Sequence, residues 1–183
     1  TGVPKLDDAN WAGTAKSDKT TLIITEGDSA KTLAIAGLSI VGRDRYGVFP
    51  LRGKCKNVRD ASIKQLADNE EFNNLKKILG LQQGKVYSSV KELRYGKLMI
   101  MTDADNDGSH IKGLVLNIFH YFWPSLLEIG FVICMVTPIV KATKGKQQKW
   151  FFTDSAFRAD ESSNPGSSWK VKYYKGLGTS TSV

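Results

Sequence analysis

The segment that most constrains the fold of this chain is a short apolar run followed by three alternating aspartates. Residues 97–101 have the composition of a central strand in a parallel sheet, which helices cover on both faces. Asp103, Asp105 and Asp107 follow at once, and Gly108 comes next. Ligand sites of open α/β sheets lie at the carboxyl ends of strands, where these aspartates fall. The segment therefore predicts a fold class and the place of a site.

The same aspartates predict a bound cation. Carboxylates crowded this closely raise the pKa of one another unless a cation neutralises them. Carboxylate oxygens are suitable ligands for a hard divalent ion, and Mg²⁺ is the ion we expect.

Two other structures could produce this pattern. In an EF-hand calcium loop the twelfth position should be a glutamate, but here it is Leu114, and the ninth position is Ile111. Both residues belong to the apolar stripe of a predicted helix. Alternatively, Asp107 or Ser109 could cap that helix, which explains one carboxylate and leaves two unexplained. A metal site accounts for all three.

A second acidic turn follows a second predicted strand. Residues 21–25 form a β-branched run, and Glu26 and Gly27 come directly after it, ahead of a helical pattern. Gly27 permits a tight turn, and Asp28 or Ser29 is expected to cap the helix. The carboxyl ends of parallel strands meet at one edge of a sheet, so we expect Glu26 beside the aspartates.

The rest of the pattern continues the alternation of strands and helices. Strands are expected at 46–51, 131–140, 149–152 and 169–174, and helices at 62–79 and 111–122. The later helix either stops at Pro124 or runs on to Gly130. Pro138 predicts a bulge or an exit from the sheet, and 162–168 reads as a loop. The prediction is an α/β parallel sheet flanked by helices, with a small C-terminal extension that contains strands.

Composition narrows the function classes. The 183 residues suffice for one α/β domain with an appendage, and the net charge of +8 predicts a polyanionic partner. No run of 18 apolar residues and no secretory leader occurs, so neither a membrane span nor secretion is expected. Cys55 and Cys134, with only two histidines, provide no zinc set and no disulfide framework, as expected of an intracellular protein.

Four ordered motifs across nearly the whole chain resemble the Toprim domain of type II DNA topoisomerases. They are Glu-Gly-Asp-Ser-Ala at 26–30, Pro-Leu-Arg-Gly-Lys at 50–54, Asp-Ala-Asp-Asn-Asp-Gly-Ser-His at 103–110 and Tyr-Lys-Gly-Leu-Gly-Thr at 174–179. The eukaryotic branch is the more similar one, on the segments 4–10, 110–114, 123–127 and 172–181. The resemblance implies the Toprim, Rossmann-like, form of the α/β fold.

The resemblance also implies an enzyme that cuts both strands of one DNA duplex, passes a second duplex through and reseals the first, driven by ATP. Glu26, Asp103 and Asp105 would hold the catalytic Mg²⁺, with Asp107 at a second metal position. Glu26 could act as a ligand, as a general acid or base, or as both. The residues implied to lie along the DNA backbone are Arg52, Lys54 and, as a weaker candidate, Lys175.

Further implications concern partners and domains. The partners would be double-stranded DNA, a second copy in a homodimer, and the ATPase and winged-helix domains of the same polypeptide, in the nucleus. Residues 1–20 would be an arm from an upstream ATPase–transducer region, 21–145 the Toprim core, and 146–183 its extension. His110 is expected to be a structural hydrogen-bonding residue. Cys55 and Lys56 depart from the family, which has apolar residues there.

The chain is expected to be inactive by itself. In the family the nucleophilic tyrosine lies in a winged-helix domain, and no tyrosine of this chain has such a context. No G-x-x-x-x-G-K-[ST] motif for ATP is present either. The alternatives are a non-catalytic basic DNA-binding module and a Toprim domain of a primase or nuclease, although those enzymes lack the 50–54 and 174–179 motifs.

Overall fold

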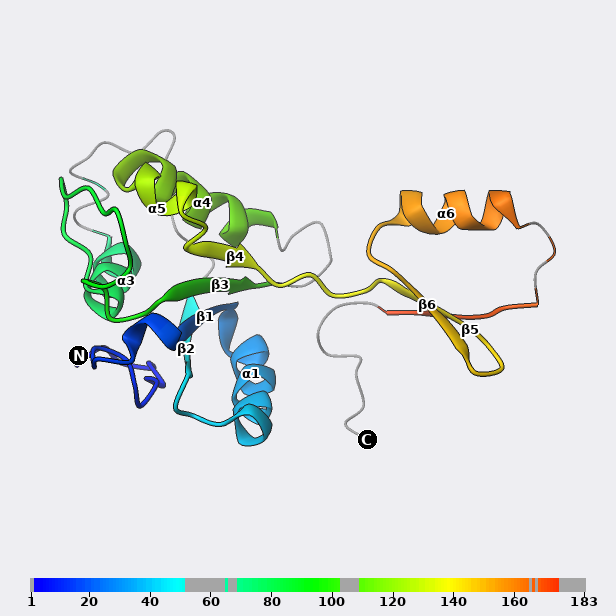
Figure 1. Cartoon of the computed structure of the whole chain (residues 1–183), viewed down its shortest axis with the longest axis horizontal. Coiled ribbons are helices and arrows are strands. Elements are labelled where there is room, and N and C mark those ends of the chain that lie inside the picture. The colour runs from blue at the N-terminus through cyan, green and yellow to red at the C-terminus, as the bar shows by residue number, and fades with distance from the viewer. Residues whose placement is uncertain are drawn as a thin grey trace. The chain divides into compact units, whose positions relative to one another are not determined.

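The structure is a computed structural model, and it describes residues 2–51, 65, 69–102, 109–164, 166 and 168–174. The chain forms two compact units, of which the first holds residues 1–102 and 108–135 and the second includes 136–183. We call them the parallel-sheet unit and the antiparallel-sheet unit (Figure 1).

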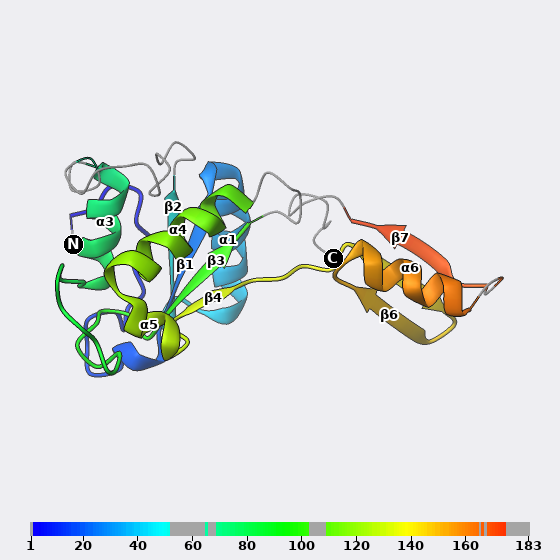
Figure 2. The same ribbon diagram turned by 90° about the horizontal axis from the view of Figure 1, so that it is seen from above.

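The parallel-sheet unit confirms the predicted α/β fold. Its strands are β1 (Thr21–Glu26), β2 (Tyr46–Leu51), β3 (Lys97–Met101) and β4 (Val132–Cys134), all parallel, in the order β2-β1-β3-β4. Its helices are η1 (Ser17–Lys19), α1 (Gly27–Val41), α3 (Glu70–Leu79), α4 (Ser109–Phe122) and α5 (Pro124–Glu128). The sheet lies between α1 on one face and α4 with α5 on the other (Figure 1). Figure 2 views the sheet from the side that α4 and α5 cover.

The main core lies between the sheet and the helices α3 and α4. Side chains of a strand alternate between its faces, and Leu22, Ile24 and Leu98 supply the sheet side of this core, each 0% exposed. On the helix side, the ring of Phe72 from α3 lies 5.1 Å from that of Phe122. Full burial of such a side chain contributes about 1.5–3 kcal/mol, so these contacts fix both helices on the unit.

The break between α4 and α5 resolves one of the alternatives that the sequence left open. The first helix ends at Phe122, and Pro124 occupies the first turn of the next. Proline disfavours a helical conformation in the residue before it, and Trp123 accordingly has φ −141° and ψ 59°. The prediction that the helix stops at Pro124 is confirmed, and a new short helix begins there.

The predicted helix at 62–79 is described in its second half. α3 begins after Asn69, whose side chain accepts a hydrogen bond from the Phe72 backbone N–H at 3.0 Å, and it ends at Gly80 in a left-handed conformation with φ +75°. Gln65 is also helical. Residues 62–64 and 66–68 lie outside the described part.

The N-terminal segment packs onto the parallel-sheet unit although its pattern is irregular. Its backbone forms an isolated bridge, since Asp7 N–H donates to the Val48 carbonyl at 2.9 Å and Val48 N–H donates back at 2.8 Å. The Tyr95 hydroxyl donates to the Asp8 carboxylate and accepts from the Ala9 N–H at 3.0 Å. Burial and the hydrogen bond to Asp8 raise the pKa of the Tyr95 phenol well above its usual range. The backbone bridge to Val48 and the hydrogen bonds of Tyr95 thus anchor the N-terminal segment to the unit.

The antiparallel-sheet unit differs from the prediction in the extent of its strands. It contains β5 (Val140–Lys144), β6 (Gln147–Phe151), β7 (Lys170–Tyr173) and α6 (Asp154–Ser163), with the strand order β6-β5-β7. The single strand expected at 131–140 is wrong, because β4 ends at Cys134 and β5 begins at Val140 in another sheet. Pro138 lies between them, so the expected exit from the sheet is confirmed.

Helix α6 was not predicted, and its last residues fall in the expected loop at 162–168. Its only buried residue is Phe157, so it lacks the apolar periodicity that identifies a helix. Local signals were nevertheless present. The Thr153 hydroxyl caps the helix by accepting from the Ala156 N–H at 3.2 Å, and Arg158 pairs with Asp154 at 2.6 Å.

Across the part of the chain that the structure describes, no helix has both the length and the apolar character needed to cross a bilayer.

Candidate metal and DNA-cleavage site

Glu26 is the predicted site residue that the structure places directly. It is the half-buried last residue of β1, and α1 begins immediately after it at Gly27. Gly27 has φ +71°, a conformation in which a side chain would be strained. The buried Thr25 hydroxyl donates to the Gly27 carbonyl at 3.3 Å across this turn. The chain direction after Glu26 is therefore fixed by local geometry.

The predicted cap of α1 is wrong in position. We expected Asp28 or Ser29 as the capping residue, but the N-cap residue is Glu26, and the two others lie within the first helical turn. The Glu26 side chain makes no capping hydrogen bond to the helix. The positive φ of Gly27 lets the chain turn into the helix earlier than the polar residues suggested.

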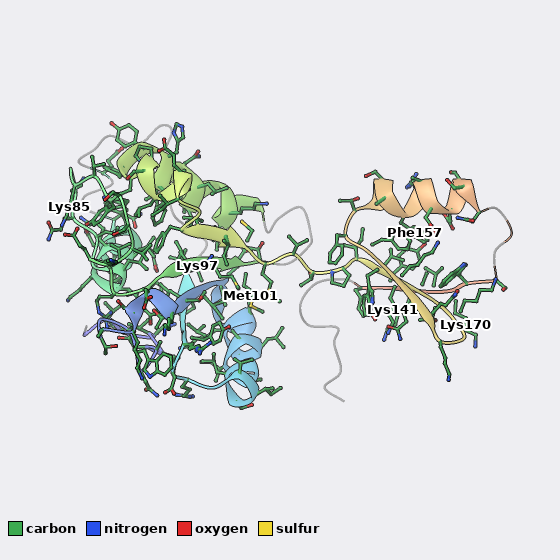
Figure 3. The ribbon with its side chains drawn as sticks, in the orientation of Figure 1. Lys85, Lys97, Met101, Lys141, Phe157 and Lys170 are labelled. Atoms are coloured by element: carbon green, nitrogen blue, oxygen red, sulfur yellow. The ribbon has the colours of Figure 1, made fainter. Side chains whose placement is uncertain are left out.

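The strand register places Glu26 beside the ends of the two strands that precede the other predicted site residues in the chain. Glu26 pairs with Leu51, the residue before Arg52. On the other side Thr25, the neighbour of Glu26, pairs with Met101, which lies two residues before Asp103. Figure 3 labels Lys97 and Met101 at the two ends of β3. Glu26 thus lies between the carboxyl ends of β2 and β3, the strands that Arg52 and Asp103 follow in the sequence.

Strand alternation also assigns a face to Glu26. It shares the parity of Leu22 and Ile24, which belong to the core packed against α3 and α4. The aspartate segment connects β3 to α4, the helix on that same face. Glu26 therefore belongs to the face of the sheet that α4 covers, and α4 is the helix that follows the aspartates in the chain.

The gap between β1 and β3 is the point at which the connections of the sheet change direction. After β1 the chain passes through α1 to β2 on one side, and after β3 it passes through α4 to β4 on the other side. Open α/β sheets bind ligands in the crevice at the carboxyl ends of strands at such a switch point. Glu26 ends one of the two strands that flank it.

The other predicted site residues lie outside the described residues. These are Arg52, Lys54, Asp103, Asp105, Asp107 and Lys175, and the description also excludes the side chains of Ser109 and His110. Within the described ranges, no group of three His, Cys, Asp or Glu side chains could hold a metal. The approach of Glu26 to the aspartates therefore stays a prediction that the register supports.

The EF-hand alternative is wrong. An EF-hand requires a helix before its loop, but β3 precedes the aspartate segment. At the ninth and twelfth positions, Ile111 is buried and Leu114 packs against the core. These apolar side chains cannot bind calcium. For the helix-cap alternative, Ser109 is already the first residue of α4, and Asp107 lies outside the described residues.

Two tyrosines, Tyr95 and Tyr87, have structural roles. The Tyr95 hydroxyl is hydrogen-bonded to Asp8 and Ala9, and the Tyr87 hydroxyl accepts from the Gln82 N–H at 2.8 Å, with both rings buried.

Sequence reasoning did not single out the lysines of β5 and β7. The alternation Trp169-Lys170-Val171-Lys172 was the signal, because every second side chain of a strand lies on one face.

Comparison with known proteins assigns both parts of the chain. The family model of the Toprim domain matches residues 21–134, and that of the C-terminal associated domain of TOPRIM matches 135–183. The chain is 61% identical over 185 residues to DNA topoisomerase 2-alpha of Rattus norvegicus and of Homo sapiens. It is 61% identical over 188 residues to "DNA topoisomerase 2, mitochondrial" of Dictyostelium discoideum.

These alignments cover 99% of this chain but only 12% of the two alpha proteins and 15% of the mitochondrial one. Among solved structures, the Plasmodium falciparum topoisomerase II DNA-binding, cleavage and re-ligation domain superposes with a TM-score of 0.88 at 59% identity. That match covers 99% of this chain and 25% of the other. The chain thus spans a small part of the proteins it resembles.

Proposed function

This chain belongs to the Toprim domain family, and from that premise we propose that it forms the magnesium-binding part of the DNA cleavage and religation site of an ATP-dependent type II DNA topoisomerase. The whole enzyme would cut both strands of one duplex, pass a second duplex through the break and reseal it. The observation that supports this most is the position of Glu26 at the switch point between β1 and β3, directly after Thr25, whose partner Met101 lies two residues before Asp103.

The donor set suits Mg²⁺. Glu26 ends β1, and three aspartates follow β3, so every proposed ligand is a carboxylate of the kind that hard divalent ions prefer. Glu26, Asp103 and Asp105 would hold the catalytic ion, and Asp107 would contribute to a second position. The ion, when bound, supplies positive charge that stabilises the phosphate and the oxygen leaving it.

The remaining chemistry falls to side chains of this chain and its partners. Glu26 can also hold or release a proton at its carboxylate, as a general acid or base. Arg52 and Lys54, which follow β2, would bind the DNA backbone beside the scissile phosphate, and Lys175, just after β7, is a third candidate. The attacking tyrosine would come from a winged-helix domain of the same polypeptide.

The proposed setting follows that of the relatives. The partners are double-stranded DNA, a second copy in a homodimer and the ATPase domain, which binds ATP outside this chain. We propose residues 1–20 as the arm from the ATPase–transducer region, 21–145 as the Toprim core and 146–183 as its extension. We also propose a nuclear location. The similarity to a relative named mitochondrial is equally high, so the nuclear address would reside elsewhere in the polypeptide.

A plasmid assay tests this function. With supercoiled DNA, Mg²⁺ and ATP, residues 1–183 alone should neither cleave nor relax the DNA, because the nucleophile and the ATPase would belong to domains other than the two that residues 21–183 match. A longer chain that includes the winged-helix domain should cleave DNA, and Glu26→Gln in it should abolish cleavage. Asp18→Asn is the matched control, since Asp18 is exposed and lies just before the opposite end of β1. Full cleavage by the Glu26→Gln chain would overturn the proposal.

A further inference from the structure

The antiparallel-sheet unit has one covered face and one open face. α6 covers the first, where Val140, Ala142 and Phe157 are buried. The Phe157 ring lies 5.3 Å from that of Phe151 and 5.8 Å from that of Tyr173, edge to face in both pairs. Figure 3 shows Phe157 between α6 and the sheet, with Lys141 on the other side of the sheet.

The strand register assembles a set of basic and aromatic side chains on the open face. Lys141 of β5 pairs with Trp150 of β6 on one side and with Lys172 of β7 on the other, so the three share a face. Lys170 is two residues from Lys172 and points the same way. The ring of Tyr174, after the end of β7, stacks on that of Trp150 at 6.3 Å. We call these five residues the basic sheet face.

Aromatic rings contact two of the three lysines of this face. The Lys141 ammonium lies 4.5 Å from the centre of the Trp150 ring, and the Lys172 ammonium lies 5.3 Å from that of Tyr174. Such contacts contribute about 0.5–1 kcal/mol at exposed sites and do not neutralise the charge. The face therefore presents positioned positive charge beside exposed ring surface, since Trp150 is 44% exposed.

Acidic residues are kept away from this face. Between residues 136 and 174, every aspartate and glutamate lies in α6, at Asp154, Asp160 and Glu161. Lys149, which alternation places on the covered face, is the lysine that pairs with one of them, Asp160, at 2.6 Å. The covered side thus carries charges of both signs, with Lys149 paired to α6, whereas the open side carries charges of one sign, which is the distribution that attracts a polyanion.

We propose that the basic sheet face is a second docking surface for the phosphate backbone of duplex DNA, made of residues other than the proposed metal ligands. The choice of DNA as the polyanion rests on the proposed function. The geometry favours phosphates because three lysines lie within a few strand spacings on a broad surface, and each can neutralise one phosphate.

Salt-dependent binding of a fluorescein-labelled duplex tests the proposal. Fluorescence anisotropy would be measured between about 50 and 200 mM salt in EDTA, so that no metal bridges DNA to the carboxylates. The variant Lys170→Gln/Lys172→Gln removes two exposed charges of the face. The matched control, Lys77→Gln/Lys91→Gln, removes two exposed charges from the parallel-sheet unit.

The log-log salt slope of the variant should be less steep than that of the parent by about 1.8, or about 0.9 per lost contact, whereas the control should keep the parental slope. A variant slope equal to that of the control would overturn the proposal. So would a poly-glutamate peptide that displaces the duplex at equal charge concentration, because the face would then bind acidic protein.

The outcome is distinguishable from failure of the proposed function. If the proposed carboxylates bind Mg²⁺, the ion should raise the melting temperature of the chain. This rise should be the same in Lys170→Gln/Lys172→Gln as in the parent, because neither lysine is a proposed metal ligand. If the variant and the control have equal salt slopes while Mg²⁺ still raises the melting temperature, only the docking surface is contradicted. If Mg²⁺ does not raise the melting temperature while the variant still has the less steep salt slope, only the metal site is contradicted.

Discussion

The two sheets of this chain carry charge in different ways. In the parallel sheet, alternation with helices leaves polar residues at strand ends, and Glu26 lies at the end of a strand whose body is buried. In the antiparallel sheet one face is open, and Lys141, Lys170 and Lys172 spread along it. The carboxyl ends of neighbouring parallel strands lie side by side at one edge, which suits a small ion. An open sheet face is broad, which suits an extended polyanion.

The sheets also differ in how they are stabilised. Both faces of β1 and β3 are covered, and aromatic packing among Phe72, Phe119 and Trp123 fixes the helices above them. The antiparallel sheet is covered on one face by α6, with Phe157 as the buried residue of that helix. Local stability follows buried apolar contact, so we expect the antiparallel-sheet unit to open at lower free energy.

Trp123→Ala should have the largest effect on stability. Trp123 is 1% exposed, its ring lies 5.7 Å from that of Phe119, and its Nε1–H donates to the Gln82 carbonyl at 2.9 Å. Loss of this side chain should cost about 3–5 kcal/mol in the free energy of unfolding. Urea denaturation followed by circular dichroism measures the loss.

Phe157→Ala is the counterpart in the other unit and sharpens the comparison. Hydrogen exchange should accelerate in β5, β6 and β7 and remain slow in β1 and β3, because the buried contacts of Phe157 lie within the antiparallel-sheet unit. Equal acceleration of exchange in both sheets would show that the units unfold together. It would contradict the expectation that the antiparallel-sheet unit opens at lower free energy.

Tyr95→Phe should have a smaller, pH-dependent effect. The variant leaves Asp8 and the Ala9 N–H without the hydroxyl between them, at a cost of about 1–3 kcal/mol near neutral pH. The pKa of the Tyr95 phenol is raised in the folded state by burial and by Asp8. Its contribution is therefore fully present below the unfolded pKa of about 10 and is lost as pH rises above it.

The stability gap between the parent and Tyr95→Phe should consequently narrow in urea titrations above about pH 10. All other titrating groups are common to the two proteins, so they leave the gap unchanged. A constant gap up to the most alkaline condition would show that the phenol is not protected by the fold.

The parallel sheet was predictable because burial on both faces requires continuous apolar runs. The strands at 46–51 and 97–101 were placed without error, and β1 extends one residue past its predicted end, to Glu26. The apolar run at 131–140, in contrast, passes from the first unit into the second and contributes to two sheets, and no period of hydrophobicity marks the change. Helix α6 was missed because Phe157 is its only buried residue.

The place of Glu26 at a strand end was predictable, whereas the approach of the other carboxylates to it stays a prediction. The sequence placed Glu26 at a strand end, and the register adds that it pairs with Leu51 and that its neighbour Thr25 pairs with Met101. Convergence of carboxylates from separate strands depends on the turns that follow them. The positive φ of Gly27 shows how such a turn departs from polar patterning, since it moved the start of α1 ahead of the expected caps.

The most direct test of the metal site is the melting temperature of the chain with and without Mg²⁺. A folded state that binds the ion in preference to the unfolded chain gains about 2.7 kcal/mol at 100 times the dissociation constant. Asp105→Asn removes a repelling charge and a ligand together, whereas Asp18→Asn changes an exposed aspartate just before the far end of β1.

Mg²⁺ should raise the melting temperature of the parent and of Asp18→Asn equally. Asp105→Asn should melt no lower than the parent without metal and should respond less to Mg²⁺. If Asp105→Asn instead melts well below the parent without metal and keeps the full Mg²⁺ response, the carboxylates are structural and the proposed metal site is wrong.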